Sequence, residues 1–332
     1  MKLVPRNAPH IRHSDNSKTV MGDMIVSLLP LYFIAFCYYG MRVLVMMAIS
    51  LVVCFVADTA GDLLAGRGYN FRDFSPFVTG LLIPLMMPAT AQYRMVVVAG
   101  LAAILIAKQP FGGTGDNFFN PAAAGIAFAI ACWPTEMFLY PNPFDTITVW
   151  GEQAAQTSAG GAFSLRLGGI PALNLQDMFL GVFQGPMGTT CVLVILACFL
   201  YLAFRRTIRP ELTISFLLAA ALFAFLFPRT TAQPMEGVLY EMMSGTMVFS
   251  AVFMLTDPVT SPKTPLACVL YGLVAGVVTM GFRYLGGFEQ AAPFAILLMN
   301  ALSPLFDEGV WRLKTRLLKR EEGGEPDEAY AD

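Results

Sequence analysis

A polar interruption inside a long apolar stretch constrains this chain more than any other feature. The stretch covers residues 237–281, and residues 254–265, MLTDPVTSPKTP, break it. Pro258 and Pro262 have no backbone N–H to donate, so a helix cannot pass through them unchanged. Backbone that unwinds inside a bilayer must be satisfied by protein or must line a cavity. We therefore expect a broken membrane helix whose polar centre, with Asp257, lines a cavity.

Three other segments combine glycine and proline in a similar way. They are 79–90, TGLLIPLMMPAT; 112–121, GGTGDNFFNP; and 286–293, GGFEQAAP. Glycine and proline are also frequent in ordinary membrane helices, which is the plainer interpretation. We favour a repeat, because four correspondences recur in order along the chain. They are Thr79-Gly80 with Ser244-Gly245, Pro88 with Pro258, Gly112 with Gly286, and Pro121 with Pro293.

The composition is typical of an integral membrane protein. Of 332 residues, 56% are hydrophobic and 13% are charged, and the mean hydropathy is +0.61. Apolar windows of about 17–25 residues, the length that crosses a bilayer, predict ten helices. Several windows are short, as expected where a helix is broken and its polar end is buried in protein. They lie near 21–38, 42–58, 76–91, 95–109, 119–135, 186–204, 211–227, 239–256, 266–282 and 290–306.

The helix count determines the predicted fold. With five helices per half in one membrane, the second half must be inverted relative to the first. We predict an all-α polytopic membrane protein of ten transmembrane helices in two inverted five-helix repeats with broken helices. The predicted segments are a cytoplasmic N-terminal tail (1–20), the first five-helix repeat (21–135), an extracytoplasmic loop (136–185), the second five-helix repeat (186–306) and a cytoplasmic tail (307–332).

The distribution of basic residues predicts the orientation. Lysine and arginine are retained in cytoplasmic loops. With the N-terminus inside, sixteen of the 21 basic residues fall in cytoplasmic segments and five in outer loops. Both termini are therefore expected in the cytoplasm. The five outer residues are Arg42, Arg94, Arg166, Arg229 and Arg283.

Acidic residues near the membrane are candidates for an ion path. Asp257, with Thr256 and Thr260, could coordinate a cation through hard oxygens, or could cap the helix that follows. Asp58 and Asp62 stand four residues apart and so share one helix face. Because they lie near the predicted interface, we interpret them as solvated helix-end acids, with an ion path as the alternative.

Five motifs, in one order, carry a resemblance to a known family. They are APHIRHSDNSKTVMGDMIVSLLP, SPFVTGLLIPLMMP, GDNFFNPAAAGIAF, MLTDPVTSP and APFAILLMNALSPLFD. This order, from Pro9 to about Asp307, resembles the RnfD family of membrane subunits from the ion-translocating Rnf ferredoxin:NAD oxidoreductase complex. NqrB, from the sodium-pumping NADH:quinone oxidoreductase, is its relative. The resemblance implies a multi-pass, ten-helix protein in the bacterial cytoplasmic (inner) membrane. It also implies flavin, and electron transfer coupled to sodium or proton translocation.

The resemblance also implies partners and a cofactor. Nothing in the sequence resembles a nucleotide-binding domain, an iron–sulfur ligand set or a haem ligand pair, so electrons must pass to and from other subunits. The expected partners are the C, G, E, A and B subunits of an Rnf-type complex, with membrane lipid. We expect no catalytic residue and no metal centre on this chain. We also expect no nucleic-acid surface, because its basic residues are scattered.

We expect a flavin, FMN or riboflavin, that is bound non-covalently at the breaks. Glycines there allow close approach of the backbone, and the helix that starts at Asn120 offers free N–H groups to a polar ring edge. Pro121 equally suits the first position of any helix. The predicted cofactor-binding residues are Thr79, Gly80, Asn120, Pro121, Ser244, Gly245, Thr256, Asp257 and Thr260.

The covalent flavin site of the family is altered here. Most members have Ser/Thr-Gly-Ala-Thr-Pro-Leu, whose last threonine takes FMN as a phosphoester. The counterpart in this chain is GGAFSL, residues 160–165, with Phe163 at the acceptor position. A phenyl ring has no oxygen to esterify, so we expect no covalent FMN there. The nearby hydroxyls Thr157, Ser158 and Ser164 are the fallback positions. A solute channel or transporter with the same fold and no flavin is the alternative function.

Overall fold

The structure is a computed structural model that describes residues 17–67, 73–151, 155–171, 173–286 and 289–321. Most of these residues are helical. In the described part of the chain, one small antiparallel sheet pairs β1 (Leu139–Pro141) with β2 (Thr157–Ala159). Residues 1–16 of the predicted N-terminal tail and 322–332 of the C-terminal tail lie outside the described ranges.

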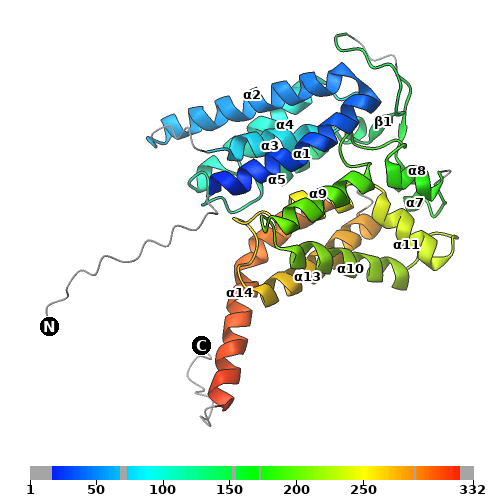
Figure 1. Cartoon of the computed structure of the whole chain (residues 1–332). Coiled ribbons are helices and arrows are strands. Elements are labelled where there is room, and N and C mark those ends of the chain that lie inside the picture. The colour runs from blue at the N-terminus through cyan, green and yellow to red at the C-terminus, as the bar shows by residue number, and fades with distance from the viewer. Residues whose placement is uncertain (1–16, 68–72, 152–154, 172, 287–288, 322–332) are drawn as a thin grey trace.

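The helices form two groups that lie one above the other in Figure 1. The upper group contains α1 (Ser17–Tyr39), α2 (Met41–Leu64), α3 (Ser75–Leu85), α4 (Tyr93–Leu105), the 3-10 turn η1 (Gln109–Phe111) and α5 (Pro121–Cys132). The connecting segment contains α6 (Pro134–Met137), β1, β2, α7 (Gly161–Arg166) and α8 (Leu175–Leu180). The lower group contains α9 (Val192–Phe204), α10 (Pro210–Leu226), α11 (Pro234–Met243), α12 (Met247–Phe253), α13 (Pro265–Leu285) and α14 (Ala292–Glu321).

Several helices have the length and apolarity of membrane spans. Within the described ranges, four helical segments are long and apolar enough to cross a membrane: Ser17–Tyr39, Met41–Leu64, Tyr93–Phe111 and Pro265–Leu285. The shorter apolar helices are α3, α5, α9 and α10. Large apolar side chains such as Phe33, Val52 and Leu200 are exposed on these helices, as expected for surfaces that face lipid.

The two groups pack in the same pattern. In the upper group, α2 packs against α3 and α4, and α4 packs against α5; in the lower group, α10 packs against α12 and α13, and α13 packs against α14. Between the groups, α1 contacts α9 and α5 contacts α14. Small residues allow the helices to approach closely: a Cβ on Gly276 of α13 would lie 2.5 Å from the carbonyl oxygen of Phe216 in α10.

The predicted interruption is confirmed, and several helix boundaries differ from the expected ones. The chain is not helical between Phe253 and Pro265, where the two prolines stand. Helix α3 ends at Leu85, ahead of Pro88, and the window 239–256 is split into α11 and α12 at Gly245, whose φ is +73°. Helix α14 continues to Glu321, well beyond the expected end at 306, because its sequence has no strong helix breaker after Pro304.

Candidate functional site

Two carboxamides join the two helix groups at their unwound segments. Asn120, just ahead of α5, donates from Nδ2 to the carbonyl of Met254, where α12 ends, over 3.0 Å. Gln290, just ahead of α14, donates from Nε2 to the carbonyl of Met86, where α3 ends, over 3.3 Å. Both side chains are almost completely buried. Each group of helices therefore supplies a donor to a carbonyl at the break in the other group; the carbonyl of Met254 also accepts from the backbone N–H of Asp257 over 3.4 Å.

Two arginines satisfy further carbonyls at the same breaks. Arg42, at the start of α2, donates to the carbonyls of Ala89 and Ala91 over 2.8 and 2.7 Å. Arg209, just ahead of α10, donates to the carbonyl of Pro262 over 2.8 Å. Arg42 is buried, and its charge is tolerated there because its donors are used by carbonyls that no helix satisfies; Arg209 is exposed.

A cavity opens beside Asn120 at the break between α12 and α13. The cavity and its open mouth enclose about 550 Å³. Its polar lining includes Thr79, Asn117, Asn120 and Asp257. The rest of the lining is apolar and comes largely from α1, α3 and the end of α12; it includes Met21, Met24, Val78, Leu82 and Phe253.

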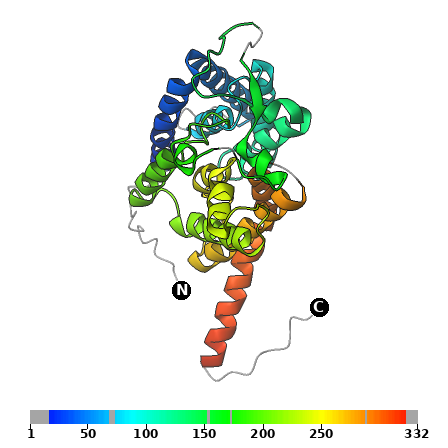
Figure 2. The ribbon, with the colours of Figure 1, turned by 90° about the vertical axis from the view of Figure 1, so that its right-hand side faces the viewer.

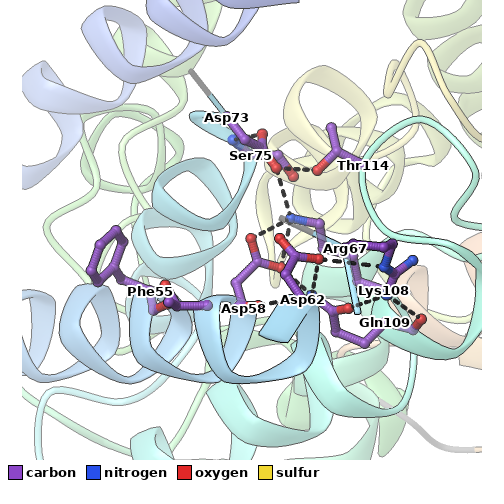
Figure 3. Close-up of polar contacts among 10 residues, drawn as sticks. Phe55, Asp58, Asp62, Arg67, Asp73, Ser75, Lys108, Gln109 and Thr114 are labelled. Carbon is purple, nitrogen blue, oxygen red and sulfur yellow. Dashed lines mark hydrogen bonds and ion pairs between the residues drawn. The ribbon is translucent and has the colours of Figure 1, made fainter. Parts of the chain in front are cut away.

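A buried cation lies next to this cavity. The Lys108 Nζ, in a side chain that is 1% exposed, lies 2.9 Å from both carboxylate oxygens of Asp58 and 3.1 Å from Asp73. Figure 3 shows these side chains converging from α2, from the segment ahead of α3 and from the segment after α4. Asp73 also accepts from the hydroxyl of Thr114, which lines the cavity. The buried charges are thus paired and lead directly to the cavity wall.

The same cluster continues outward to the protein surface. Gln109 donates from Nε2 to Asp58 over 2.8 Å and to Asp62 over 3.3 Å. Arg67, which is one-third exposed, lies 3.6 Å from Asp62 and donates to the side chain of Gln109 over 2.5 Å. An unbroken chain of polar contacts therefore connects the surface to the cavity (Figure 3).

A second buried ion pair lies in the lower group. The Arg283 Nε lies 3.1 Å from Glu241, and both side chains are 3% exposed. Arg229 donates to the same carboxylate over 2.8 Å and stacks over the ring of Tyr284. The hydroxyl of Ser244 accepts from Arg283. This site has two guanidinium groups around Glu241, whereas the site of Lys108 has more acids than bases.

The two ion pairs lie at opposite ends of the helix bundle. Helix α13 has 21 residues and runs from its start beside the Arg209–Pro262 contact past Arg283 to Leu285. The start of α1 lies at the same end of the bundle as the start of α13. Asp23 in α1 pairs with Arg205 at the end of α9, and Met21 in α1 lines the cavity together with Asp257. We name these the Lys108 end and the Arg283 end of the bundle.

The predicted binding residues fall at both ends. Thr79, Asn120, Pro121 and Asp257 line the one cavity at the Lys108 end. Gly80 does not line it, because this glycine faces the backbone of Leu51 in α2.

Thr256 and Thr260 are buried near the same cavity without forming part of its wall, and the hydroxyl of Thr256 donates to Val252. Ser244 and Gly245 lie at the Arg283 end, and the carbonyl of Glu289 would lie 3.0 Å from a Cβ on Gly245.

The residues of the family's flavin loop lie apart from the cavity. Phe163 is in α7, and its side chain is 40% exposed. Ser164 follows it in the same short helix, and helix α7 packs against α11. Thr157 and Ser158 are exposed in β2, where they pair with Pro141 and Tyr140. These hydroxyls are not gathered around one point.

The interpretation of Asp58 as a solvated helix-end acid is wrong. Its side chain is 8% exposed and pairs with Lys108, whereas Asp62, at 21%, is closer to the surface. The count of basic residues by loop places Lys108 and Arg283 in loops, although both side chains are buried. The sequence does hold a signal for them, because a basic residue precedes the glycine pair at 112 and the glycine pair at 286.

Buried ion pairs, carboxamides at helix breaks and lipid-length apolar helices define a helical membrane protein with a polar interior. The chain belongs to the NQR2, RnfD, RnfE family, which it matches over residues 4–314.

Three curated relatives, each the D subunit of its complex, are similar along nearly their whole length. The relative from the Na(+)-translocating ferredoxin:NAD(+) oxidoreductase complex of Acetobacterium woodii is 32% identical over 92% of this chain and 93% of the relative. The relative from the proton-translocating ferredoxin:NAD(+) oxidoreductase complex of Clostridium ljungdahlii is 29% identical over 91% of this chain and 92% of the relative. The relative from the ion-translocating oxidoreductase complex of Haemophilus ducreyi is 27% identical over 91% and 95%.

Removing the buried cation should destabilise the fold far more than removing the exposed one. Lys108→Met leaves Asp58 and Asp73 unpaired, which should cost about 3–5 kcal/mol of unfolding free energy. The matched change Arg67→Met should cost about 1 kcal/mol or less, because Arg67 is one-third exposed. Thermal unfolding in detergent measures both. Equal unfolding temperatures for the two variants would contradict the role given to Lys108.

Proposed function

We propose that this chain is the D subunit of an Rnf-type complex that couples electron transfer between ferredoxin and NAD to the movement of sodium ions or protons. The observation that carries the proposal is similarity to named D subunits over more than nine-tenths of both chains. The C, G, E, A and B subunits of such a complex are the proposed partners. The buried polar chain from Arg67 to the cavity agrees with a role in ion movement.

Within the complex, the chain is proposed to cross the bacterial cytoplasmic membrane ten times as two inverted repeats. Three equivalences between the halves support this arrangement. Arg42 and Arg209 serve the breaks, Asn120 and Gln290 join the halves, and Lys108 and Arg283 form the buried ion pairs at opposite ends.

The antiparallel contact between α1 and α9 also agrees with inversion, because Asp23 near the start of α1 pairs with Arg205 at the end of α9. The proposed segments are 1–20, 21–135, 136–185, 186–306 and 307–332, with both termini in the cytoplasm.

The cavity at the Lys108 end is the proposed flavin site. A flavin ring has one edge with an N–H donor and two carbonyl acceptors, and the cavity wall offers the carboxamide of Asn117 and the hydroxyl of Thr79. The ring edge would enter the cavity, and the rest of the flavin would lie in its open mouth. Met21 and Met24 are flexible side chains that can adjust to a flat ring. A flavin bound there would supply one- and two-electron transfer.

Electron transfer coupled to ion uptake should depend on this chain. Membranes from cells that lack it should lose ion uptake driven by reduced ferredoxin and NAD, and expression of the chain should restore it. Ion uptake that continues without the chain would refute the assignment. A colourless purified complex that passes solutes would favour the channel instead.

The flavin site is tested by an isosteric pair of substitutions. Thr79→Val removes a hydroxyl from the cavity wall, and Thr246→Val removes a similarly buried hydroxyl at the Arg283 end. Loss of one hydrogen bond costs about 1 kcal/mol, roughly a fivefold weaker affinity. Flavin released by acid from the washed complex should therefore fall in the Thr79 variant alone. Equal flavin content in both variants would place the flavin elsewhere.

We expect no flavin ester on this chain. The denatured natural chain should show no flavin fluorescence in a gel, because Phe163 offers no hydroxyl. Phe163→Thr alone should not restore it, since the flanking Gly160 and Ser164 also differ from the family sequence. A fluorescent band whose peptide carries the mass of FMN at Thr157, Ser158 or Ser164 would contradict this expectation.

A further inference from the structure

The last turns of α14 project beyond the helix bundle. The helix has 30 residues, which is about 45 Å and exceeds the roughly 30 Å needed to cross a bilayer. Figures 1 and 2 show its red portion running away from the other helices, and Figure 1 shows it running across the direction of α1 and α2. Pro304 lies inside this helix, where a proline removes a helix hydrogen bond.

This portion leaves the bundle at the Lys108 end. The carboxylate of Asp307 accepts from the backbone N–H groups of Lys263 and Thr264, just ahead of α13. The carbonyl of Pro262, one residue earlier, accepts from Arg209. Helix α14 therefore emerges beside the starts of α10 and α13, where one surface of the membrane would lie.

The projecting portion is amphipathic and basic. Leu313 and Leu317 are one turn apart on one face, and they are 49% and 51% exposed. Arg312 and Arg316 are likewise one turn apart on a neighbouring face, where Arg312 also pairs with Glu308 over 2.7 Å, and Lys314 lies on the other side of the leucines. Trp311 is 67% exposed. Such a helix has large apolar side chains that no residue in the described ranges covers.

We propose that residues 310–317 of α14, the surface segment, lie along the membrane surface at the Lys108 end and bind anionic phospholipid headgroups. A helix that continues from a membrane span and turns across α1 and α2 runs along the bilayer plane. Its leucines can then enter the acyl chains while its basic residues meet lipid phosphates. An exposed tryptophan at this position fits the membrane–water interface, where this residue is enriched.

Trp311 is a built-in probe for this contact. The chain has three tryptophans, so Trp133→Phe with Trp150→Phe leaves Trp311 alone. The full chain is reconstituted in bilayers of phosphatidylcholine and phosphatidylglycerol, with and without lipids brominated on the upper acyl chain. We expect brominated lipid to reduce Trp311 emission and aqueous iodide to have little effect. Quenching by iodide alone would show a segment in water, and quenching by neither would show one covered by protein. Either outcome refutes the proposal.

Headgroup charge is tested by neutralising the segment. The triple variant Arg312→Gln, Lys314→Gln, Arg316→Gln should lose quenching by brominated lipid and gain quenching by iodide in the phosphatidylglycerol bilayers. The control Arg206→Gln removes an exposed charge between α9 and α10 at the same end, and should leave Trp311 unchanged. A triple variant that is quenched like the parent would refute binding of anionic headgroups.

Discussion

Two hydrogen bonds from carboxamides to backbone carbonyls join the two helix groups where their helices are broken. Asn120 reaches Met254 and Gln290 reaches Met86, so each half supplies the donor for the break in the other. An unsatisfied carbonyl in an apolar interior costs several kcal/mol. The breaks can therefore persist only while the two halves are packed together. This dependence explains why α5 and α14 meet between the two helix groups.

The remaining polar groups serve the same requirement. Arg42 and Arg209 satisfy other carbonyls at the breaks, and the ion pairs of Lys108 and Arg283 hold the two ends of the bundle. The ends differ in charge, because Lys108 lies among acids while Arg283 and Arg229 share one glutamate. The cavity at the Lys108 end is lined by Asp257, Thr79 and Asn120 among others, whereas a smaller one at the Arg283 end is lined by Arg283, Glu289 and Thr279 among others. That asymmetry agrees with a proposed site for a flavin and for cation movement at one end.

Local chemistry explains which parts of this structure could be predicted from the sequence. The break at Pro258 and the helix start at Asn120 were predictable, because proline and asparagine act on their own backbone. Four of the predicted binding residues, which were chosen at these breaks, line one cavity. The partners of Asp58 were not predictable, because Lys108 comes from the segment after α4 and the pairing depends on tertiary packing. Counting charges by loop assigns lysines and arginines to loops in solvent, although Lys108 and Arg42 are buried.

The proposed inversion of the two halves is tested most directly by the membrane side of single cysteines. Three single-cysteine variants are made: Leu64→Cys at the end of α2, Gln233→Cys between α10 and α11, and Lys263→Cys at the Lys108 end. The exposed Cys37 and Cys132 are replaced by alanine, and intact vesicles are treated with a reagent that cannot cross the membrane. Because α2 and α10 are the second helices of their halves, inverted halves predict that positions 64 and 263 react from one side and position 233 from the other. Reaction of positions 64 and 233 from the same side would contradict the account.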